Sequence, residues 1–448
     1  MRSRTPPPTR SKRLCAVPAR VPAPWPRCPP TSGPACCTRW RPRSRPNWPR
    51  SPGCSPPRTA SPSPRRWRKS ARRRGSSGGY AGEATRLLGR QIPLDTVPGL
   101  EHHLAVTRRV PLGVVAALVP FNYPVELYAH KAAAALAAGN AVLVHPPVRC
   151  PLALLRVTAL VEAAGFPPHA HQTVTGGVHV SQALASLPGV DAVSLTGSTA
   201  AGREIARRAA DTLKRVHLEL GGNDALFVCA DADVEAAAEA VVLGRLARGN
   251  GQICCAVKRV YVDRAVHADF TEALLAKAGG LTVGDQLADG TDIGPLITAE
   301  AAARVGEAVD ALVADGARLA LGGKREGAFH GPAVLLDVPE NSPTLREEIF
   351  GPVAPVAVFD DPFAAVRLAN ESPYGLQAAV LTRDVERALR LADALDVGGV
   401  VVNGSTALRA ENLPFGGPRD TGGSAEGLHD TAREFSREKT VILTGALG

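Results

Sequence analysis

The chain has 448 residues, of which 45% are hydrophobic and 21% charged, a balance typical of folded globular proteins. This composition excludes a wholly disordered chain, a collagen and a coiled-coil rod, and no apolar run approaches the ~18 residues of a transmembrane helix. The formal charge of +10 is unevenly distributed, because residues 1–75 hold 20 basic and no acidic side chains, whereas residues 76–448 hold 32 basic and 42 acidic ones. The basic character belongs to the first segment, and we expect neither nucleic acid nor a membrane as a partner.

Residues 1–75 are rich in Pro, Arg and Ser and contain 18 of the 39 prolines, which argues against helix and central strand. We predict a disordered, extended segment. Three interpretations stay open: a tail for nucleic acid or an anionic surface, an organelle transit peptide, or a stretch that is not native coding sequence. The third is favoured because a GC-rich gene read in the wrong frame gives this composition. The five cysteines of the segment lack regular zinc spacing, so we predict no metal site.

Beyond residue 75, short apolar runs alternate with helical patterns, which predicts a parallel sheet with helices on both faces. Strands are expected at Val114–Val119, Ala141–His145, Gln172–Thr175, Ala192–Thr196 and Val216–Leu220. Helices are expected at Pro124–Ala138, at Leu152–Ala164 and in the stretch that ends at Ala210. This alternation is typical of the doubly wound, Rossmann-type α/β fold.

A second α/β unit follows the first. Its expected helices are Val234–Arg248, Ala265–Ala278, Ala301–Asp315, Ala364–Asn370 and Glu386–Leu395. Its expected strands are Val257–Val262, Val353–Phe359 and Ala378–Thr382, and the apolar run Lys439–Leu443 predicts a terminal strand.

Four short stretches contain groups suited to catalysis or cofactor binding. Cys254 follows a Gly-Gln turn, where a thiol can face a cleft, although a lone cysteine is more often buried in a core. Glu219 stands in an apolar strand end, either as a general base with a raised pKa or as a carboxylate that caps a turn. Asn122 lies between two prolines, either as a rigid oxyanion donor or as a helix N-cap. The small residues of Thr196–Gly202 leave amides open for a pyrophosphate, a weak signal by itself.

In this order and spacing, the four stretches resemble the aldehyde dehydrogenase superfamily from about Gly79 to the C-terminus. Further matching motifs are Pro111–Val115, Lys131 with Ala137–Asn140, Glu347–Val353, Pro373–Leu376 and Pro414–Gly417. Phe121–Pro124, Ala129–Lys131 and Ala256–Arg259 are most similar to one branch, which holds the lactaldehyde, phosphonoacetaldehyde and non-phosphorylating glyceraldehyde-phosphate dehydrogenases.

The resemblance implies oxidation of an aldehyde to a carboxylic acid with NAD or NADP. Cys254 would attack the aldehyde and form a thioester, with the oxyanion held by the Asn122 amide and the Cys254 backbone N–H. Glu219 would activate the water that hydrolyses the thioester, and Lys131 would support Asn122 and tune the thiol and the base. Cys255 is either a passive neighbour or a partner for a reversible oxidative bridge.

The same resemblance implies the residues that contact the cofactor. Glu348 and Phe350 match positions at the nicotinamide ribose and ring, and Gly221 matches the turn beside the nicotinamide. The complete predicted set is Phe121, His145, Gly177, Gly197, Ser198, Gly221, Glu348 and Phe350.

Some positions depart from the family pattern. A Lys and a Glu that hold the adenosine ribose in the family are replaced here by His145 and Val148. The lost Lys would attract a 2′-phosphate and the lost Glu would repel it, so NAD and NADP stay alternatives and weakened cofactor affinity is expected. Ile253 argues against phosphorylated aldehydes, for which Arg is common there. Arg409 is either a surface loop arginine or a partner for a substrate carboxylate.

We expect a disordered segment at 1–75, a Rossmann-type cofactor domain at 76–222 with an arm hairpin at 94–111, a catalytic domain at 223–421, and a C-terminal segment at 422–448. The terminal strand would complete a β arm that joins subunits in the family, so a cytoplasmic homodimer or homotetramer is expected. A CoA-acylating enzyme is disfavoured by Glu219. A catalytically impaired or non-catalytic member stays an alternative, because little family-like sequence precedes Pro111.

Overall fold

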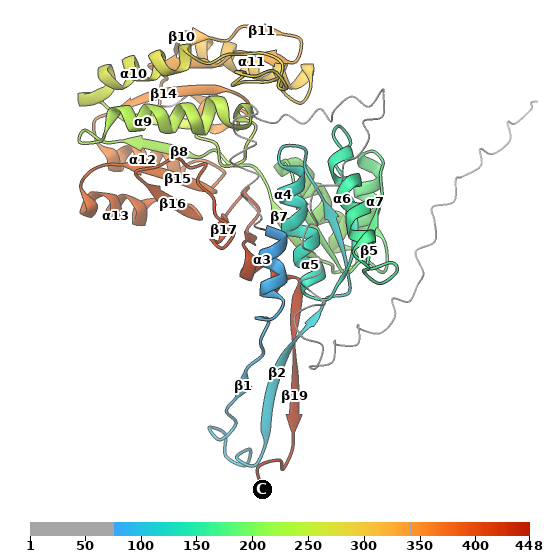
Figure 1. Cartoon of the computed structure of the whole chain (residues 1–448). Coiled ribbons are helices and arrows are strands. Elements are labelled where there is room, and N and C mark those ends of the chain that lie inside the picture. The colour runs from blue at the N-terminus through green and yellow to red at the C-terminus, as the bar shows by residue number, and fades with distance from the viewer. Residues whose placement is uncertain (1–75, 341) are drawn as a thin grey trace, which may run out of the picture.

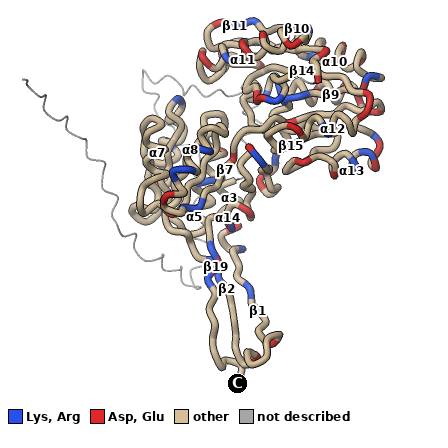
Figure 2. Tube along the Cα trace, turned by 180° about the vertical axis from the view of Figure 1, so that it is seen from behind, with Lys and Arg blue, Asp and Glu red and all other residues tan. Residues whose placement is uncertain are grey.

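The computed structural model describes residues 76–340 and 342–448, and the expectations for residues 1–75 lie outside these described residues. The described chain forms two α/β lobes side by side and a long β arm that projects from beneath them (Figure 1). Acidic and basic residues are interspersed along both lobes (Figure 2). Within residues 76–340 and 342–448, no helix has both the length and the apolar character needed to cross a bilayer.

The first lobe is built on a five-stranded parallel sheet with the order β5-β4-β3-β6-β7. Its strands are β3 (Val114–Leu118), β4 (Ala141–His145), β5 (His171–Thr173), β6 (Ala192–Thr196) and β7 (Arg215–Glu219). The chain builds outward from β3 to β5 and then returns to the other side of β3 with β6. The carboxyl ends of β3 and β6 therefore flank a topological switch point, where α/β folds bind ligands.

Helices cover both faces of this sheet because alternate residues of β3 point to opposite sides. Val115 and Ala117 pack with helices α4 (Pro124–Tyr128), α5 (Ala134–Ala137) and α6 (Leu152–Ala163), and with α3 (Ser76–Glu83) and α14 (Leu428–Glu434). The neighbouring residues Val114 and Ala116 pack against α7 (Val178–Ser186) and α8 (Thr199–Ala210). Between α4 and α5, Ala129–Ala133 form a π-helical turn, η1.

The second lobe contains a seven-stranded sheet with the order β10-β13-β14-β9-β8-β15-β16, in which only β10 is antiparallel. Its strands are β8 (Ala225–Val228), β9 (Arg259–Asp263), β10 (Arg318–Gly322), β13 (Ala333–Leu336), β14 (Val353–Phe359), β15 (Gln377–Leu381) and β16 (Gly399–Val402). Helices α9 (Val234–Val241) and α10 (His267–Gly279) cover one face. Helices α11 (Ala299–Ala314), α12 (Pro362–Asn370) and α13 (Val385–Ala394) cover the other.

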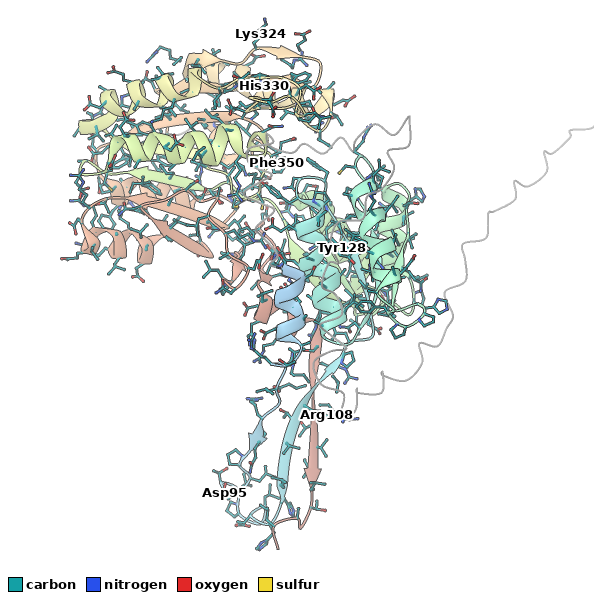
Figure 3. All side chains as sticks on the ribbon, viewed as in Figure 1. Asp95, Arg108, Tyr128, Lys324, His330 and Phe350 are labelled. Atoms are coloured by element: carbon teal, nitrogen blue, oxygen red, sulfur yellow. The ribbon has the colours of Figure 1, made fainter. Side chains whose placement is uncertain are left out.

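The arm is a three-stranded antiparallel sheet of β1 (Gln91–Ile92), β2 (Leu104–Pro111) and β19 (Ser436–Leu443). Arg108 pairs with Lys439 and Leu104 with Leu443, so the terminal strand does pair with the stretch that precedes Pro111. Figure 3 places Arg108 on the arm, far from Phe350 between the lobes.

Short elements complete the described chain. They are η2 (Val242–Ala247), η3 (Arg248–Gly251), η4 (Arg264–Val266), η5 (Pro343–Arg346), β11 (Arg325–Glu326), β12 (Phe329–His330), β17 (Phe415–Gly416) and β18 (Ala425–Glu426). Strands β17 and β18 pair with each other, so the proposed domain boundary at residue 421 falls inside a small hairpin.

The predicted α/β class is confirmed, and several expectations about elements need correction. The single helix expected at Pro124–Ala138 is interrupted by the π-helical η1. The helix expected at Val234–Arg248 keeps α-helical winding only to Val241, and then continues through the π-helical η2 into the 3-10 turn η3. The buried Arg245 lies in η2 and donates to the backbone oxygen of Ile349 at 2.9 Å. Strand β8 was not expected, because it follows β7 with no helix between them and begins the second sheet.

Candidate active site

The loop that presents Cys254 is fixed by unusual backbone geometry. Residues 249–251 all have positive φ angles, between 54° and 68°. The side chain of Asn250 locks this turn by donating from Nδ2 to the backbone oxygen of Pro295 at 3.0 Å. A Cβ atom on Gly251 would lie 2.3 Å from the backbone oxygen of Gly351, so only glycine fits there. The turn therefore sets the position of Cys254, the predicted nucleophile, three residues later.

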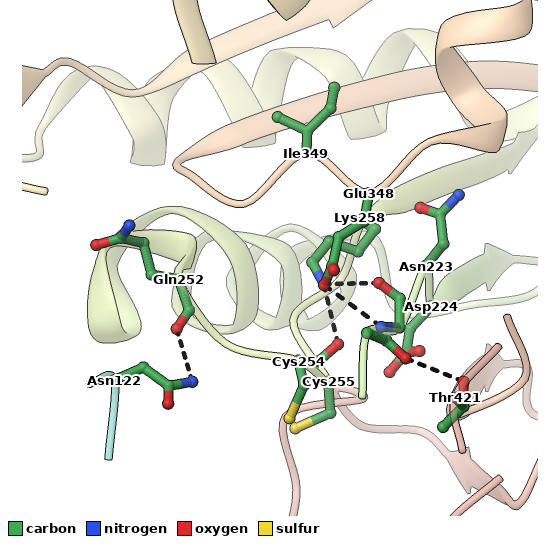
Figure 4. A network of polar contacts seen from close by, with 12 residues as sticks. Asn122, Asn223, Asp224, Gln252, Cys254, Cys255, Lys258, Glu348, Ile349 and Thr421 are labelled. Carbon is green, nitrogen blue, oxygen red and sulfur yellow. Dashed lines mark hydrogen bonds and ion pairs between the residues drawn. The ribbon is translucent and has the colours of Figure 1, made fainter. Parts of the chain in front are cut away.

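Cys254 is half-buried at the end of this loop, and its sulfur lies beside that of the buried Cys255 (Figure 4). A hydrogen bond with the Cys255 thiol and burial raise the pKa of Cys254 well above its usual value, while the charges of Arg409 and Lys258 act in the opposite direction. The resting thiol is therefore protonated, and it would have to lose its proton before acting as a nucleophile.

Asn122 follows β3 and approaches the nucleophile loop from the first lobe. Its Nδ2 donates to the backbone oxygen of Gln252 at 3.1 Å (Figure 4), and its Oδ1 accepts from the backbone N–H of Tyr123 at 3.1 Å. An amide nitrogen carries two hydrogens, so one stays available for an oxyanion near Cys254. The structure thus brings the predicted donor to the predicted nucleophile from a different lobe.

Glu219 is the last residue of β7 and is only 3% exposed. Burial and the negative charge of Glu426 raise its pKa well above the ordinary value, and the charge of Lys131 partly opposes this. Its Oε1 atom has no hydrogen-bond partner within the described part of the chain. A buried carboxyl with a raised pKa and an unpartnered oxygen is suited to accept a proton from water.

Lys131 is fully buried in η1, and burial lowers its pKa. Its Nζ donates to Oγ of Ser194 at 3.2 Å. We expected this lysine to support Asn122, but among the described residues its hydrogen bond goes to Ser194 on β6 instead. Its charge nevertheless acts on Glu219, and the charge of Glu219 acts on it.

Lys258, whose role was not predicted from the sequence, links Cys254 to the predicted cofactor carboxylate of Glu348. Its buried Nζ donates to the backbone oxygens of Gly222 and Cys254, both at 2.9 Å, and to Oε1 of Glu348 at 2.7 Å (Figure 4). A Cβ on Gly221 would lie 2.6 Å from Oε2 of Glu348, so the glycine is required for this close approach. The spacing of Lys258 from Cys254 was visible in the sequence, but its acceptors were not.

The predicted cofactor residues Phe121 and Phe350 meet between the lobes. Their rings pack edge to face, with centroids 6.1 Å apart and an interplanar angle of 83°. The Nζ of Lys258 lies 5.6 Å from the Phe350 centroid. Two aromatic rings, the Glu348 carboxylate and the Gly221 turn therefore lie close together, as the predicted nicotinamide and ribose contacts require.

Gly197 and Ser198 join β6 to α8. The Gly197 N–H donates to the backbone oxygen of Glu219 at 3.1 Å, which ties this turn to the proposed base. Ser198 is the N-cap of α8, and its Oγ accepts from the N–H of Ala201 at 3.3 Å. The turn therefore lies at the helix start where a pyrophosphate can approach, although these particular groups already have partners in the chain.

The remaining predicted cofactor residues follow β4 and β5 at the same edge of the sheet. His145 ends β4, and its Nδ1 lies 2.9 Å from the backbone oxygen of Val174, which accepts the ring N–H. Gly177 is the N-cap of α7. Val148, in place of the family's acidic residue, is 58% exposed. Parallel strands bring these positions together with Gly197 because their carboxyl ends share one edge.

Arg409 has an internal partner that the sequence did not reveal. Its guanidinium donates to Oε2 of Glu426 at 2.5 Å and lies 4.1 Å from the centroid of the Phe415 ring. The Glu426 side chain is 1% exposed and that of Arg409 is 11% exposed. Arg409 is therefore not a surface loop arginine, and its charge is balanced within the chain.

Comparisons with known proteins identify the family of this chain. The model of the aldehyde dehydrogenase family matches residues 75–441. A 3-sulfolactaldehyde dehydrogenase of Priestia aryabhattai is 38% identical over 364 residues, which cover 81% of this chain and 76% of that protein. A lactaldehyde dehydrogenase of Methanococcus maripaludis is 36% identical over 77% of this chain and 74% of its own length.

Solved structures show the same relationship. An NADP-dependent glyceraldehyde-3-phosphate dehydrogenase from Bacillus halodurans, complexed with NADP, has a TM-score of 0.82 and 35% identity, covering 86% of this chain and 81% of that one. The chain belongs to the aldehyde dehydrogenase family. The resemblance and the expectation of an aldehyde-oxidising enzyme are confirmed.

Proposed function

We propose that this protein oxidises a short polar aldehyde to its carboxylic acid with NAD or NADP, with Cys254 as nucleophile and Glu219 as general base. The observation that carries the proposal is that residues of both lobes contact the loop that holds Gln252 and Cys254. Asn122 donates to that loop from the first lobe, at Gln252, while Lys258 ties the Cys254 carbonyl to Glu348. Nucleophile, oxyanion donor and cofactor carboxylate are thereby held in one connected arrangement.

The first half of the reaction uses the thiol of Cys254. Once the thiol has lost its proton, the sulfur attacks the carbonyl carbon and the carbonyl oxygen becomes an oxyanion. The remaining N–H of the Asn122 amide and the backbone N–H of Cys254 donate to that oxygen, and one such donor contributes about 3 kcal/mol to lowering the barrier. The nicotinamide, when bound beside Phe350 and Glu348, supplies a hydride acceptor.

The second half releases the acid. Glu219 accepts a proton from a water molecule, the resulting hydroxide adds to the thioester carbon, and the bond from that carbon to the Cys254 sulfur breaks. The sulfur leaves as a thiolate and takes up the proton of the acid, so the product leaves as a carboxylate and the resting thiol is restored. The unpartnered Oε1 of Glu219 supports its role as the proton acceptor.

The substrate and the cofactor are proposed from specific positions. Ile253 offers no positive charge to a phosphorylated aldehyde, and relatives named for lactaldehyde and 3-sulfolactaldehyde support a small polar substrate. Val148 offers no negative charge to repel a 2′-phosphate, and a similar structure is complexed with NADP, so we propose that NADP is accepted along with NAD. The exposed arm supports assembly as a homodimer or homotetramer, and we propose a cytoplasmic location.

The test is formation of reduced cofactor by the purified chain with lactaldehyde and related short aldehydes, with NAD and NADP in separate assays. Wild-type protein should turn over, and Cys254→Ala should not. Cys255→Ala serves as the matched control for loss of a neighbouring thiol and should retain turnover. A folded wild-type protein without turnover at saturating cofactor would instead favour the catalytically impaired alternative.

A further inference from the structure

The general base and a buried histidine share one face of strand β7. Successive side chains of a strand alternate between faces, so His217 and Glu219 point to the same side. In the pairing of β6 with β7, Ser194 lies opposite His217 and Thr196 lies opposite Glu219. Ser194 and His217 are 0% and 2% exposed. The Ser194 hydroxyl and the His217 imidazole are therefore buried on the same face of the sheet as Glu219, the proposed base.

These two side chains form the middle of a continuous hydrogen-bonded chain. Lys131 Nζ lies 3.2 Å from Ser194 Oγ, and Ser194 Oγ lies 3.3 Å from His217 Nδ1. On the other side of the ring, His217 Nε2 lies 3.2 Å from Oε2 of Glu434, a side chain that is 37% exposed. The chain of contacts thus runs from the buried Lys131, whose charge acts on Glu219, to the partly exposed Glu434 at the end of α14.

The chemistry of the four groups fixes the direction of every hydrogen bond. A lysine ammonium group is only a donor, so the Ser194 oxygen accepts from it. His217 Nε2 faces two acceptors, the Glu434 carboxylate and the backbone oxygen of Ala425 at 3.5 Å, so Nε2 carries the ring hydrogen. Nδ1 is then the acceptor, and the Ser194 hydroxyl donates to it. In each of the three hydrogen bonds, the donor lies on the Lys131 side and the acceptor on the Glu434 side. This common direction allows a proton to pass from each group to the next.

The ends of the chain lie among other charged groups. Lys131 is faced by Glu219, Glu426 and Arg409, and burial lowers its pKa. Near the surface end, Glu434 is influenced by Arg215 and Asp430, and burial raises its pKa. A lysine that loses its proton readily and a carboxylate that gains one readily are matched to pass a proton outward.

We propose that Lys131, Ser194, His217 and Glu434 form a proton exit route for the aldehyde dehydrogenase reaction, a role that rests on the proposed function of Glu219. Oxidation and hydrolysis release protons from the Cys254 thiol and from the attacking water. Lys131 gives its ammonium proton to Ser194, whose hydroxyl proton moves to His217 Nδ1. The amine that this leaves neutral accepts the proton that Glu219 has taken. The Nε2 proton passes to Glu434 and then to solvent, so one proton enters and one leaves.

The test compares Ser194→Ala, which breaks the route at its centre, with Ser194→Thr, which keeps the hydroxyl. His217→Gln interrupts the route at the ring, and Asp430→Asn is the matched control for loss of an acid on α14. Reduced cofactor is followed through the first turnover and into the steady state, in H2O and in D2O. Thermal melting establishes that each variant is folded.

Ser194→Ala and His217→Gln should keep a fast first turnover and lose steady-state kcat by about tenfold or more, with unchanged KM values and a larger solvent isotope effect. Ser194→Thr and Asp430→Asn should behave like the wild type. Glu434→Gln, a change at the partly exposed end that is compatible with folding, should lose kcat and recover it when a small acid–base buffer such as imidazole is added.

Steady-state kcat equal to wild type in folded Ser194→Ala would overturn the route, as would equal losses in Ser194→Ala and Ser194→Thr. Absence of buffer recovery in Glu434→Gln would also overturn it. Failure of the proposed function looks different, because then Cys254→Ala or Glu219→Gln would turn over like the wild type. If both of those variants are inactive in the steady state while the route variants match the wild type, only the exit route is wrong.

Discussion

The Nζ atom of Lys258 lies 2.7 Å from Oε1 of Glu348, and the pair is almost fully buried, with the lysine side chain 1% and the glutamate side chain 15% exposed. Because the same Nζ donates to the carbonyl oxygen of Cys254, one side chain holds both the Cys254 loop and the proposed cofactor carboxylate. The Cys254 carbonyl and the Glu348 carboxylate therefore share one buried hydrogen-bond donor.

Replacing this lysine should weaken cofactor binding and folding together. Lys258→Met leaves the Glu348 carboxylate without its partner, and removing one member of a buried pair costs about 3 kcal/mol or more. We expect a lower urea midpoint and a larger increase in KM for the cofactor than for the aldehyde. The double variant Lys258→Met/Glu348→Gln should regain part of the stability. A single variant with the wild-type urea midpoint and cofactor KM would contradict the positioning role.

Gly251 should be intolerant of a methyl group. Its φ of 68° already disfavours alanine, by about 1–2 kcal/mol, and the added Cβ would also press on the oxygen of Gly351. Gly327 is a matched control, since its φ is 55° and nothing lies within 4 Å of a built Cβ. Gly251→Ala should abolish most turnover and lower the melting temperature well beyond Gly327→Ala. Equal effects of the two changes would show that the close contact is unimportant.

Activity should rise with pH across the neutral range. The pKa values of Cys254 and Glu219 are both raised, and each group acts in its deprotonated form, so activity is lost as pH falls through those raised values. The measurement is kcat/KM and kcat against pH. Glu219→Gln should release about one reduced cofactor per subunit in a first turnover and then stall, because the thioester is not hydrolysed. Sustained turnover by this variant would exclude Glu219 as the base.

The choice between the two cofactors should respond to charge at Val148. Val148→Glu places a carboxylate where the adenosine ribose is expected, and repulsion of a 2′-phosphate costs on the order of 1 kcal/mol. The ratio of kcat/KM with NADP to that with NAD should therefore fall about fivefold, while Val148→Gln, which adds similar bulk without charge, should change it little. An equal response to both substitutions would place the 2′-phosphate away from this position.

Local sequence was sufficient for most of the first sheet. The strands expected at Ala141–His145 and Ala192–Thr196 have those bounds in the structure, because each is a short apolar run bounded by turn residues. Strand β8 was missed because the regular alternation of strand and helix stops there, where the chain crosses between sheets. The winding of the helix after Val241 was also not predictable, since it accompanies the burial of Arg245 against Ile349.

The sequence by itself determined which groups carry the proposed chemistry, since Cys254, Glu219 and Asn122 each stand in a short motif whose turn or strand is locally encoded. Only the tertiary structure decided their partners. Lys258 and Glu348 are separated by 90 positions, and His217 meets Glu434 only after α14 has packed against the first lobe. A short sequence motif specifies local conformation. Burial and hydrogen bonds between segments far apart in the sequence form only when the sheets and helices pack together, so a motif does not specify them.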